Sequence, residues 1–174
     1  MRFVDFLRVT VLLSAGAASL LAALCVIGAG RDGNSKLVLI CAAWWAIAGV
    51  IGLFLGRRES ASEPIARLLA DSKAATMLPE HRPGATILNR LWPLLLSMVA
   101  AGAIAFLAPQ ISGIAAGFAI ISALAWRRQD AAVQAIEERD GVTFFVEHTS
   151  PVKPIRLIRT PGFRRERPIM PTAG

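Results

Sequence analysis

The stretch LVLICAAWWAIAGVIGLFLG, residues 37–56, contains no Asp, Glu, Lys, Arg or His. A helix that crosses a bilayer needs about 20 predominantly apolar residues, because the hydrocarbon core is roughly 30 Å thick and a helix rises about 1.5 Å per residue. The stretch meets that length without a single charge. We therefore predict that residues 37–56 form a transmembrane helix.

Three further runs without Asp, Glu, Lys, Arg or His cover positions 9–30, 91–110 and 111–126. The first two have the length of a membrane span, and the last is slightly short but can continue into the charged residues that follow. Because 55% of the chain is hydrophobic, four buried helices of this kind would leave too little polar surface to cover a globule. The expected fold class is an all-α integral membrane protein with two antiparallel helical hairpins. Its four transmembrane helices are expected at about 4–30, 37–56, 91–108 and 110–126.

The basic residues are distributed unevenly over the segments that flank these helices. Arg31 and Lys36 lie between the first two helices, whereas the other 17 of the 19 Lys and Arg residues lie before the first helix, in residues 57–90, or after Trp126. Short loops rich in Lys and Arg remain in the cytoplasm. We therefore expect a multi-pass protein of the inner (plasma) membrane with both termini in the cytoplasm.

The cytoplasmic segments carry structure of their own. Residues 63–78 are expected to form an amphipathic helix, since Pro64 suits a first helical turn and Pro79 stops a helix. This helix either packs against its own protein or lies on the inner leaflet. Residues 1–126 then form a four-helix transmembrane domain, and residues 127–174 form a cytoplasmic region.

The cytoplasmic region is expected to begin as an extension of the last helix, which ends at Gly141 because glycine favours a left-handed helix C-terminus. Residues 142–149 and 155–160 alternate in polarity and are rich in β-formers, which predicts a small β-hairpin. An isolated hairpin is only marginally stable in water, so it needs cover from the 63–78 helix, another subunit or lipid headgroups. A basic tail follows.

Small residues recur at close-packing spacing within the apolar runs. In lipid, helices associate through such residues because their backbones can approach closely. Packing inside the bundle accounts for most of them, and self-association of the chain is the second interpretation. The predicted helix-packing residues are Gly52, Gly56, Gly113, Gly117, Ser14, Ala18 and Ala22.

Two pairs of side chains within these runs are less ordinary. Trp44 and Trp45 lie about seven residues into the second run, roughly 10 Å deep, where they either fill space among small residues or line a constriction. Cys25 and Cys41 lie at similar depths on neighbouring antiparallel helices. They are two free thiols or, if their Cα atoms come within about 7 Å, a disulfide.

The chain offers no catalytic, cofactor-binding or metal-binding pattern. Its two histidines, His81 and His148, lack a second His or a Cys at ligand spacing, so neither a metal site nor a cofactor is expected. The apolar runs also hold no charge, which weighs against a proton-coupled transporter. A channel lined by backbone or hydroxyl groups is retained as an alternative interpretation.

Residues 141–174 carry six of the 19 Lys and Arg residues, and the whole chain has a net charge of +7. Topology alone accounts for much of this charge, and contact with anionic lipids or with an acidic protein partner are the alternatives. Nucleic-acid binding is not expected, because no nucleic-acid-binding fold accompanies the charge. The residues expected to contact anionic lipid or a partner are Lys153, Arg156, Arg159, Arg164, Arg165 and Arg167.

These features predict a non-enzymatic membrane protein that acts as a scaffold or accessory subunit through its cytoplasmic face. A small homo-oligomeric channel, built from the helices rich in small residues, is the alternative, and a membrane-embedded enzyme is third. The expected partners are the bilayer, including its anionic lipids, and either further copies of the chain or another membrane protein.

Overall fold

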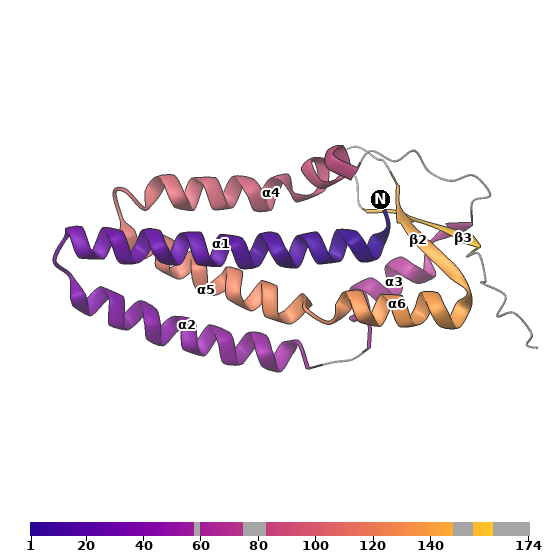
Figure 1. Cartoon of the computed structure of the whole chain (residues 1–174), viewed down its shortest axis with the longest axis horizontal. Helices are drawn as coiled ribbons and strands as arrows, with labels where there is room; N and C mark the ends of the chain where they lie inside the picture. Colours follow the sequence, from indigo (N-terminus) through magenta and orange to yellow (C-terminus); the bar gives the residue numbers. More distant parts are fainter. Residues whose placement is uncertain (58–59, 75–82, 148–154, 162–174) are drawn as a thin grey trace, which may run out of the picture.

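Four long helices run side by side in the computed structural model, and a group of shorter elements lies at one end (Figure 1). The structure describes residues 1–57, 60–74, 83–147 and 155–161. Within these residues, four segments are long and apolar enough to cross a membrane by length and composition, which confirms the expected four long apolar helices. They are Phe3–Arg31, Ser35–Leu55, Ile87–Ile104 and Pro109–Asp140.

The bounds of the long helices follow from local sequence signals. The turn after the first helix uses Gly33 at a φ of 62° and Asn34, whose side chain accepts a hydrogen bond from the backbone N–H of Leu37. Pro109 occupies the first turn of the last long helix, where proline is well tolerated. The long helices are α1 (Phe3–Arg31), α2 (Ser35–Leu55), α4 (Pro83–Ile104) and α5 (Pro109–Trp126).

The prediction of 91–108 for the third long helix is wrong at both ends. α4 begins at Pro83, because proline suits a first helical turn and the apolar pattern already starts before position 91. At its other end the helix stops at Ile104. The residue before Pro109 is driven out of the helical region, and Ala108 accordingly has φ −145° and ψ 85°.

The central helix of the bundle is α5, which lies between α1 and α2 and makes its most extensive contacts with them (Figure 1). Its buried face includes Gly113, Ala116 and Gly117, which allow both neighbours to approach closely. α1 and α2 touch each other much less, and α4 makes fewer contacts with α1 and α5. The predicted arrangement as two hairpins is therefore not confirmed, because α5 lies between the first two helices.

The shorter elements form a cap at the end of the bundle that holds the start of α1 (Figure 1). The strands of the cap make one sheet in the order β1-β3-β2, in which β2 and β3 are antiparallel and β1 and β3 are parallel. β2 and β3 therefore pair as the predicted hairpin over the ranges Val142–Val146 and Leu157–Pro161, and positions 148 and 149 of the first expected strand lie outside the described residues. The cap comprises residues 1–7, α3 (Glu63–Ala70), β1 (Lys73–Ala74), α6 (Gln129–Asp140), β2 (Val142–Val146) and β3 (Leu157–Pro161).

Two expectations for the segment after α2 are corrected. The amphipathic helix expected at 63–78 ends at Ala70, because the following Asp71 and Ser72 favour turns over helix interiors. The chain then extends as β1 and pairs with β3, so the expected two-stranded hairpin is part of a three-stranded mixed sheet. Positions 75–78 of the expected helix lie outside the described residues.

The predicted extension of the last long helix is observed with one interruption. A turn at Arg127 and Arg128 separates α5 from α6. Gly141 follows α6 at a φ of 64°, the left-handed conformation that the sequence suggested.

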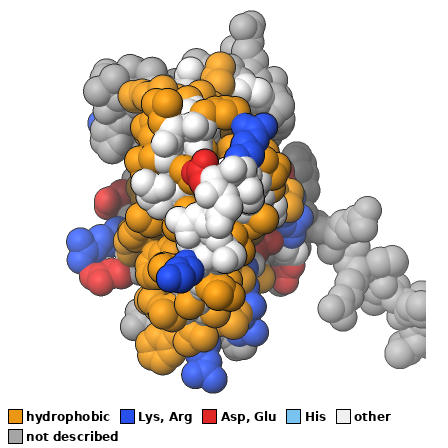
Figure 2. All heavy atoms as spheres, turned by 90° about the vertical axis from the view of Figure 1, so that its left-hand side faces the viewer, with side chains coloured by type: hydrophobic (Ala, Val, Ile, Leu, Met, Phe, Trp, Pro, Cys, Tyr) orange, Lys and Arg blue, Asp and Glu red, His pale blue; other side chains and the backbone are white. Residues whose placement is uncertain are grey.

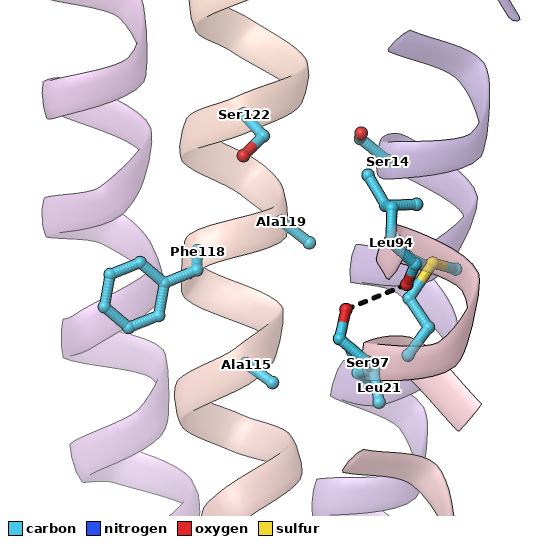
Figure 3. Close-up of a pocket in the computed structure, with 10 residues that line it drawn as sticks. Ser14, Leu21, Leu94, Ser97, Ala115, Phe118, Ala119 and Ser122 are labelled. Atoms are coloured by element: carbon cyan, nitrogen blue, oxygen red, sulfur yellow. Dashed lines mark hydrogen bonds between the residues drawn. The ribbon is translucent and has the colours of Figure 1, made fainter. Parts of the chain in front are cut away.

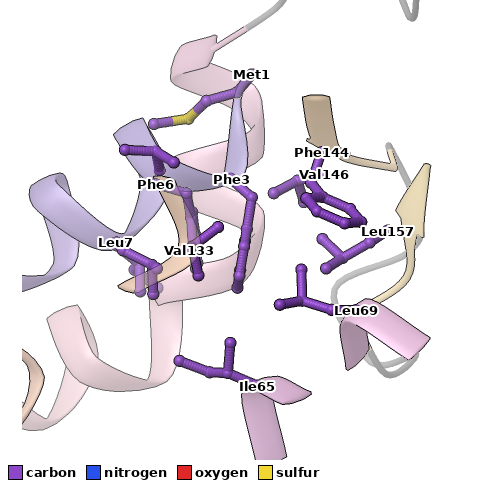
Figure 4. Close-up of a cluster of buried hydrophobic side chains, with 12 residues drawn as sticks. Met1, Phe3, Phe6, Leu7, Ile65, Leu69, Val133, Phe144, Val146 and Leu157 are labelled. Atoms are coloured by element: carbon purple, nitrogen blue, oxygen red, sulfur yellow. The ribbon is translucent and has the colours of Figure 1, made fainter. Parts of the chain in front are cut away.

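The largest buried side chains of the described residues gather mainly in the cap (Figure 4). Phe3 and Leu7 of α1, Ile65 of α3 and Val133 of α6 are each at most 2% exposed, and Phe144 of β2 packs against them. Burying one such side chain contributes about 1.5–3 kcal/mol. α1, α3 and α6 therefore supply the cover that the hairpin required, and α3 packs against its own protein.

Candidate functional site

In the long helices, side-chain size differs between buried and exposed positions. The residues that α1, α2, α4 and α5 bury against one another are mostly small, whereas large apolar side chains are exposed along the same helices. Soluble proteins bury their large apolar side chains, so this distribution fits a bundle whose outer surface faces lipid. Buried examples are Ala17, Ala29, Ala48, Gly52 and Ala116, and exposed examples are Leu12, Leu39, Val50, Phe54 and Val99.

The predicted glycine pairs meet at the contact between α2 and α5. A Cβ atom at Gly52 would lie 2.8 Å from the Cβ of Leu124 on α5, and one at Gly56 would collide with the backbone of the same residue. A Cβ atom at Gly113 would lie 2.5 Å from the Sγ of Cys41. All four glycines, including Gly117 beside Trp44, therefore make close helix contacts within one chain.

Both predicted tryptophans of α2 are hydrogen-bonded to α5. The indole N–H of Trp44 donates to the carbonyl of Ile114 at 3.2 Å, and that of Trp45 donates to the carbonyl of Gly113 at 2.8 Å. The ring of Trp44 also meets Phe118 edge to face at 5.7 Å between centroids. These contacts favour the interpretation in which the tryptophans fill space and hold α2 against α5.

The two cysteines lie together where α1, α2 and α5 meet. Their Sγ atoms are 3.5 Å apart, both side chains are buried, and both thiols are free. Gly113 makes room for this pair, since a Cβ there would lie 2.8 Å from the Sγ of Cys25. The similar depth inferred for Cys25 and Cys41 from the sequence is confirmed.

One residue of the small-residue stripe of α1, Ser14, lines a cavity of about 260 Å³ between α1, α4 and α5 (Figure 3). Ser14 and Ala18 of this stripe are buried and Ala22 is half-buried. Ser97 and Ser122 also line the cavity, and the sequence gave no signal for them because single serines on separate helices form no pattern before the helices are packed. The lining residues are Ser14, Ala17, Leu21, Leu94, Ser97, Met98, Ala115, Phe118, Ala119 and Ser122.

Ion pairs and amide contacts join the cap to the start of α1. Arg2 donates from Nη2 to Oε2 of the buried Glu137 at 2.8 Å, and the other carboxylate oxygen accepts from the backbone N–H of Phe144 at 2.9 Å. Arg8 pairs with Asp130 at 2.9 Å between Nε and Oδ2. Charge-assisted bonds of this kind are stronger than neutral ones, so they tie α1, α6 and β2 together.

The basic residues predicted to contact lipid or a partner are only partly described. Arg156 and Arg159 are exposed at the cap, the latter on β3. Figure 2 looks onto the opposite end of the bundle, where hydrophobic side chains prevail and charged side chains of both signs are seen between them and around the rim. Lys153, Arg164, Arg165 and Arg167 lie outside the described residues.

Among the described residues, no group of three or more His, Cys, Asp or Glu side chains is placed to hold a metal ion. Comparison of the chain with protein-family models, curated proteins and solved structures finds no match.

Proposed function

We propose that the chain is a multi-pass inner-membrane protein that acts, without catalysis, as a scaffold or accessory subunit through a cap on the cytoplasmic side. The observation that carries this proposal is the contrast between the two parts of the molecule. The bundle exposes large apolar side chains and holds small ones inside, whereas the cap encloses the large buried core and its ion pairs.

Membrane insertion is supported by the length and surface of the four helices. Each candidate span reaches 18 residues or more, and only 11–33% of its residues are buried inside the molecule. A soluble protein with that much exposed apolar surface would aggregate, because contiguous apolar patches on monomers rarely exceed a few hundred Å². Lipid is the solvent that suits this surface.

The proposed orientation follows from the position of the basic residues. Arg31 and Lys36 flank the turn between α1 and α2, at the end of the bundle away from the cap (Figure 1). The other described Lys and Arg residues belong to the cap or to the helix ends and connections beside it. Because basic segments are retained in the cytoplasm, we place the cap and both termini there.

A scaffold role is favoured by how the cap is built. Residues from the start of α1, from the connection after α2 and from the segment after α5 form one core, so the cap is fixed to the bundle at several points. The exposed Arg156 and Arg159 stand on this fixed platform and are suited to an acidic partner or anionic headgroups.

Site-specific photocrosslinking in the native membrane tests the scaffold proposal. We expect benzoylphenylalanine in place of Arg156 or Arg159 to give one discrete adduct with another membrane protein. The same group in place of Lys36, at the opposite end of the bundle, should give none. The purified protein should be monomeric in nanodiscs and should not conduct in planar bilayers.

The homo-oligomeric channel remains the alternative function. Its support from the glycine pairs is weakened, because Gly52, Gly56, Gly113 and Gly117 all make contacts within one chain. A defined homo-oligomer with single-channel conductance would favour the channel and contradict the scaffold proposal.

A further inference from the structure

We propose that the cavity between α1, α4 and α5 binds one acyl chain of a membrane phospholipid, with the hydroxyl of Ser14 donating a hydrogen bond to the ester carbonyl of that chain. This inference rests on the membrane placement proposed above. It goes beyond the scaffold role because it assigns a ligand to a site inside the bundle.

The first support is the unusual state of Ser14. Its side chain is only 3% exposed, and its hydroxyl points from α1 toward α5 into the cavity (Figure 3). Among the described residues it has no hydrogen-bond partner, whereas the hydroxyls of Thr10, Ser19 and Ser97 each donate to a carbonyl of their own helix. No fully buried side-chain oxygen of the described residues lacks a hydrogen-bond partner, so this hydroxyl is open to the cavity. A hydroxyl that faces a mostly apolar cavity without an acceptor is unfavourable, so an acceptor inside the cavity would satisfy it.

The second support is the size and chemistry of the cavity. Its volume of about 260 Å³ exceeds the roughly 150 Å³ of an engineered apolar cavity that takes up benzene. The hydroxyl of Ser97 is already bonded to the carbonyl of Leu94. The hydroxyls of Ser14 and Ser122 are the other polar side-chain groups of the lining, and the remaining lining side chains are apolar. The cavity therefore suits a hydrocarbon chain with one polar group.

The third support is depth. Arg8 and Asp130 form an ion pair at the base of the cap, where the headgroups would lie. Ser14 follows six residues later on α1, about 9 Å deeper, and Leu21 lies a further 10 Å or so along the same helix. The interfacial layer on each side of the hydrocarbon core is roughly 5–7 Å thick. The hydroxyl thus lies close to the depth of ester carbonyls, and the apolar part of the cavity lies below it.

The fourth support is access. α4 is the least packed of the long helices, since only 11% of its span is buried in the molecule. Leu94, Ser97 and Met98 of α4 form the outer wall of the cavity, and Ser97 is exposed. A chain can therefore enter from the surrounding lipid between α4 and α5.

Photolabelling in vesicles tests the proposal on the full-length protein. The probe is a phosphatidylcholine with a diazirine in one acyl chain, diluted into vesicles of dioleoyl phosphatidylcholine. We expect labelling, mapped by mass spectrometry, to be concentrated on Leu94–Met98 and Ala115–Ser122. Leu39 and Ile40, which are exposed on α2, report contact with bulk lipid.

A matched pair of substitutions separates the cavity from the surface. Ala119→Phe places a ring in the cavity and should reduce the labelling of its lining several-fold. Ala100→Phe makes the same change at an exposed position of α4 and should leave that labelling unchanged. Both variants should keep wild-type labelling at Leu39 and Ile40.

The role of Ser14 is tested by comparing the ester probe with an analogue that joins the labelled chain by an ether. Because a hydrogen bond is lost, we expect the wild-type protein to favour the ester roughly 2- to 10-fold. Ser14→Ala should bring this ratio close to one. Ser19→Ala, which removes a hydroxyl already bonded to the carbonyl of Ala15, should preserve it.

Two negative outcomes are distinguishable. Labelling at Leu39 and Ile40 without enrichment in the cavity, or an ester preference that survives Ser14→Ala, would overturn the lipid site and leave the membrane placement intact. Absence of labelling at every helix would instead overturn the membrane placement on which the site rests.

Discussion

At the scale of single residues, the buried carboxylate of Glu137 links three parts of the chain. It accepts from Arg2 at the N-terminus and from the backbone N–H of Phe144 on β2, and it is only 5% exposed. A buried charge whose partner is removed is left uncompensated. The cap therefore depends on a residue that composition and periodicity did not single out, because the contact joins positions 135 residues apart.

We predict that Arg2→Ala lowers the free energy of unfolding by about 1–3 kcal/mol, because the carboxylate of Glu137 loses its charged donor. The control is Arg67→Ala, which removes the exposed pair with Glu63 on α3 and should cost no more than about 0.5 kcal/mol. Unfolding in mixed detergent micelles, followed by tryptophan fluorescence, measures both. Equal effects of the two variants would contradict the role assigned to Glu137.

The cysteine pair gives a second prediction at this scale. Since the Sγ atoms of Cys25 and Cys41 lie 3.5 Å apart, copper phenanthroline should join them within one chain. Intact mass should fall by two hydrogens, and Cys25→Ser should abolish the change. Cross-linked dimers, or no reaction in the folded protein, would contradict the packing of α1 against α2 and α5 at this point.

At the scale of elements, the contact between α2 and α5 holds the bundle together through small residues and two indole hydrogen bonds. The glycines of this contact were predictable, because GxxxG spacing is visible in the sequence. Their partners were not, since the sequence alone does not show that α5 lies between α1 and α2. Small residues on several helices are compatible with more than one packing order.

We predict that Gly117→Ala destabilises the bundle by about 1–3 kcal/mol, because the new methyl group would overlap the indole of Trp44. Gly49→Ala on α2 is the matched control, since a Cβ there meets no atom within 4 Å. That variant should be neutral or stabilising by up to about 1 kcal/mol, as alanine favours helix. Thermal unfolding in detergent measures both, and a neutral Gly117→Ala would show that the contact is looser than described.

The cap shows how far elements can be read from the sequence. The alternating pattern after Gly141 predicted β2 and β3, and the left-handed glycine predicted the end of α6. β1 was missed because two residues carry no periodicity, and it exists only by pairing with β3. The cavity was also missed, because its lining comes from three helices whose packing order the sequence does not give.

At the scale of the whole molecule, the bundle and the cap differ in how they distribute apolar and charged side chains. The bundle has small residues inside and large apolar residues outside, which is suited to lipid, whereas the cap has a core of aromatic and branched side chains and exposed charged side chains of both signs, which is suited to water. The proposed orientation adds that the cap faces the cytoplasm. Membrane topology is then the main explanation for the Lys and Arg residues near the cap, and binding of lipid or a partner is a secondary one.

Cysteine accessibility in intact cells tests this central claim most directly. In a variant with Cys25→Ala and Cys41→Ala, a cysteine is introduced either as Asn34→Cys, in the turn between α1 and α2, or as Arg156→Cys, at the cap. We expect a membrane-impermeant maleimide to label the first variant from outside and the second only after the membrane is permeabilised. Labelling of Arg156→Cys from outside, or of neither position without permeabilisation, would contradict the account.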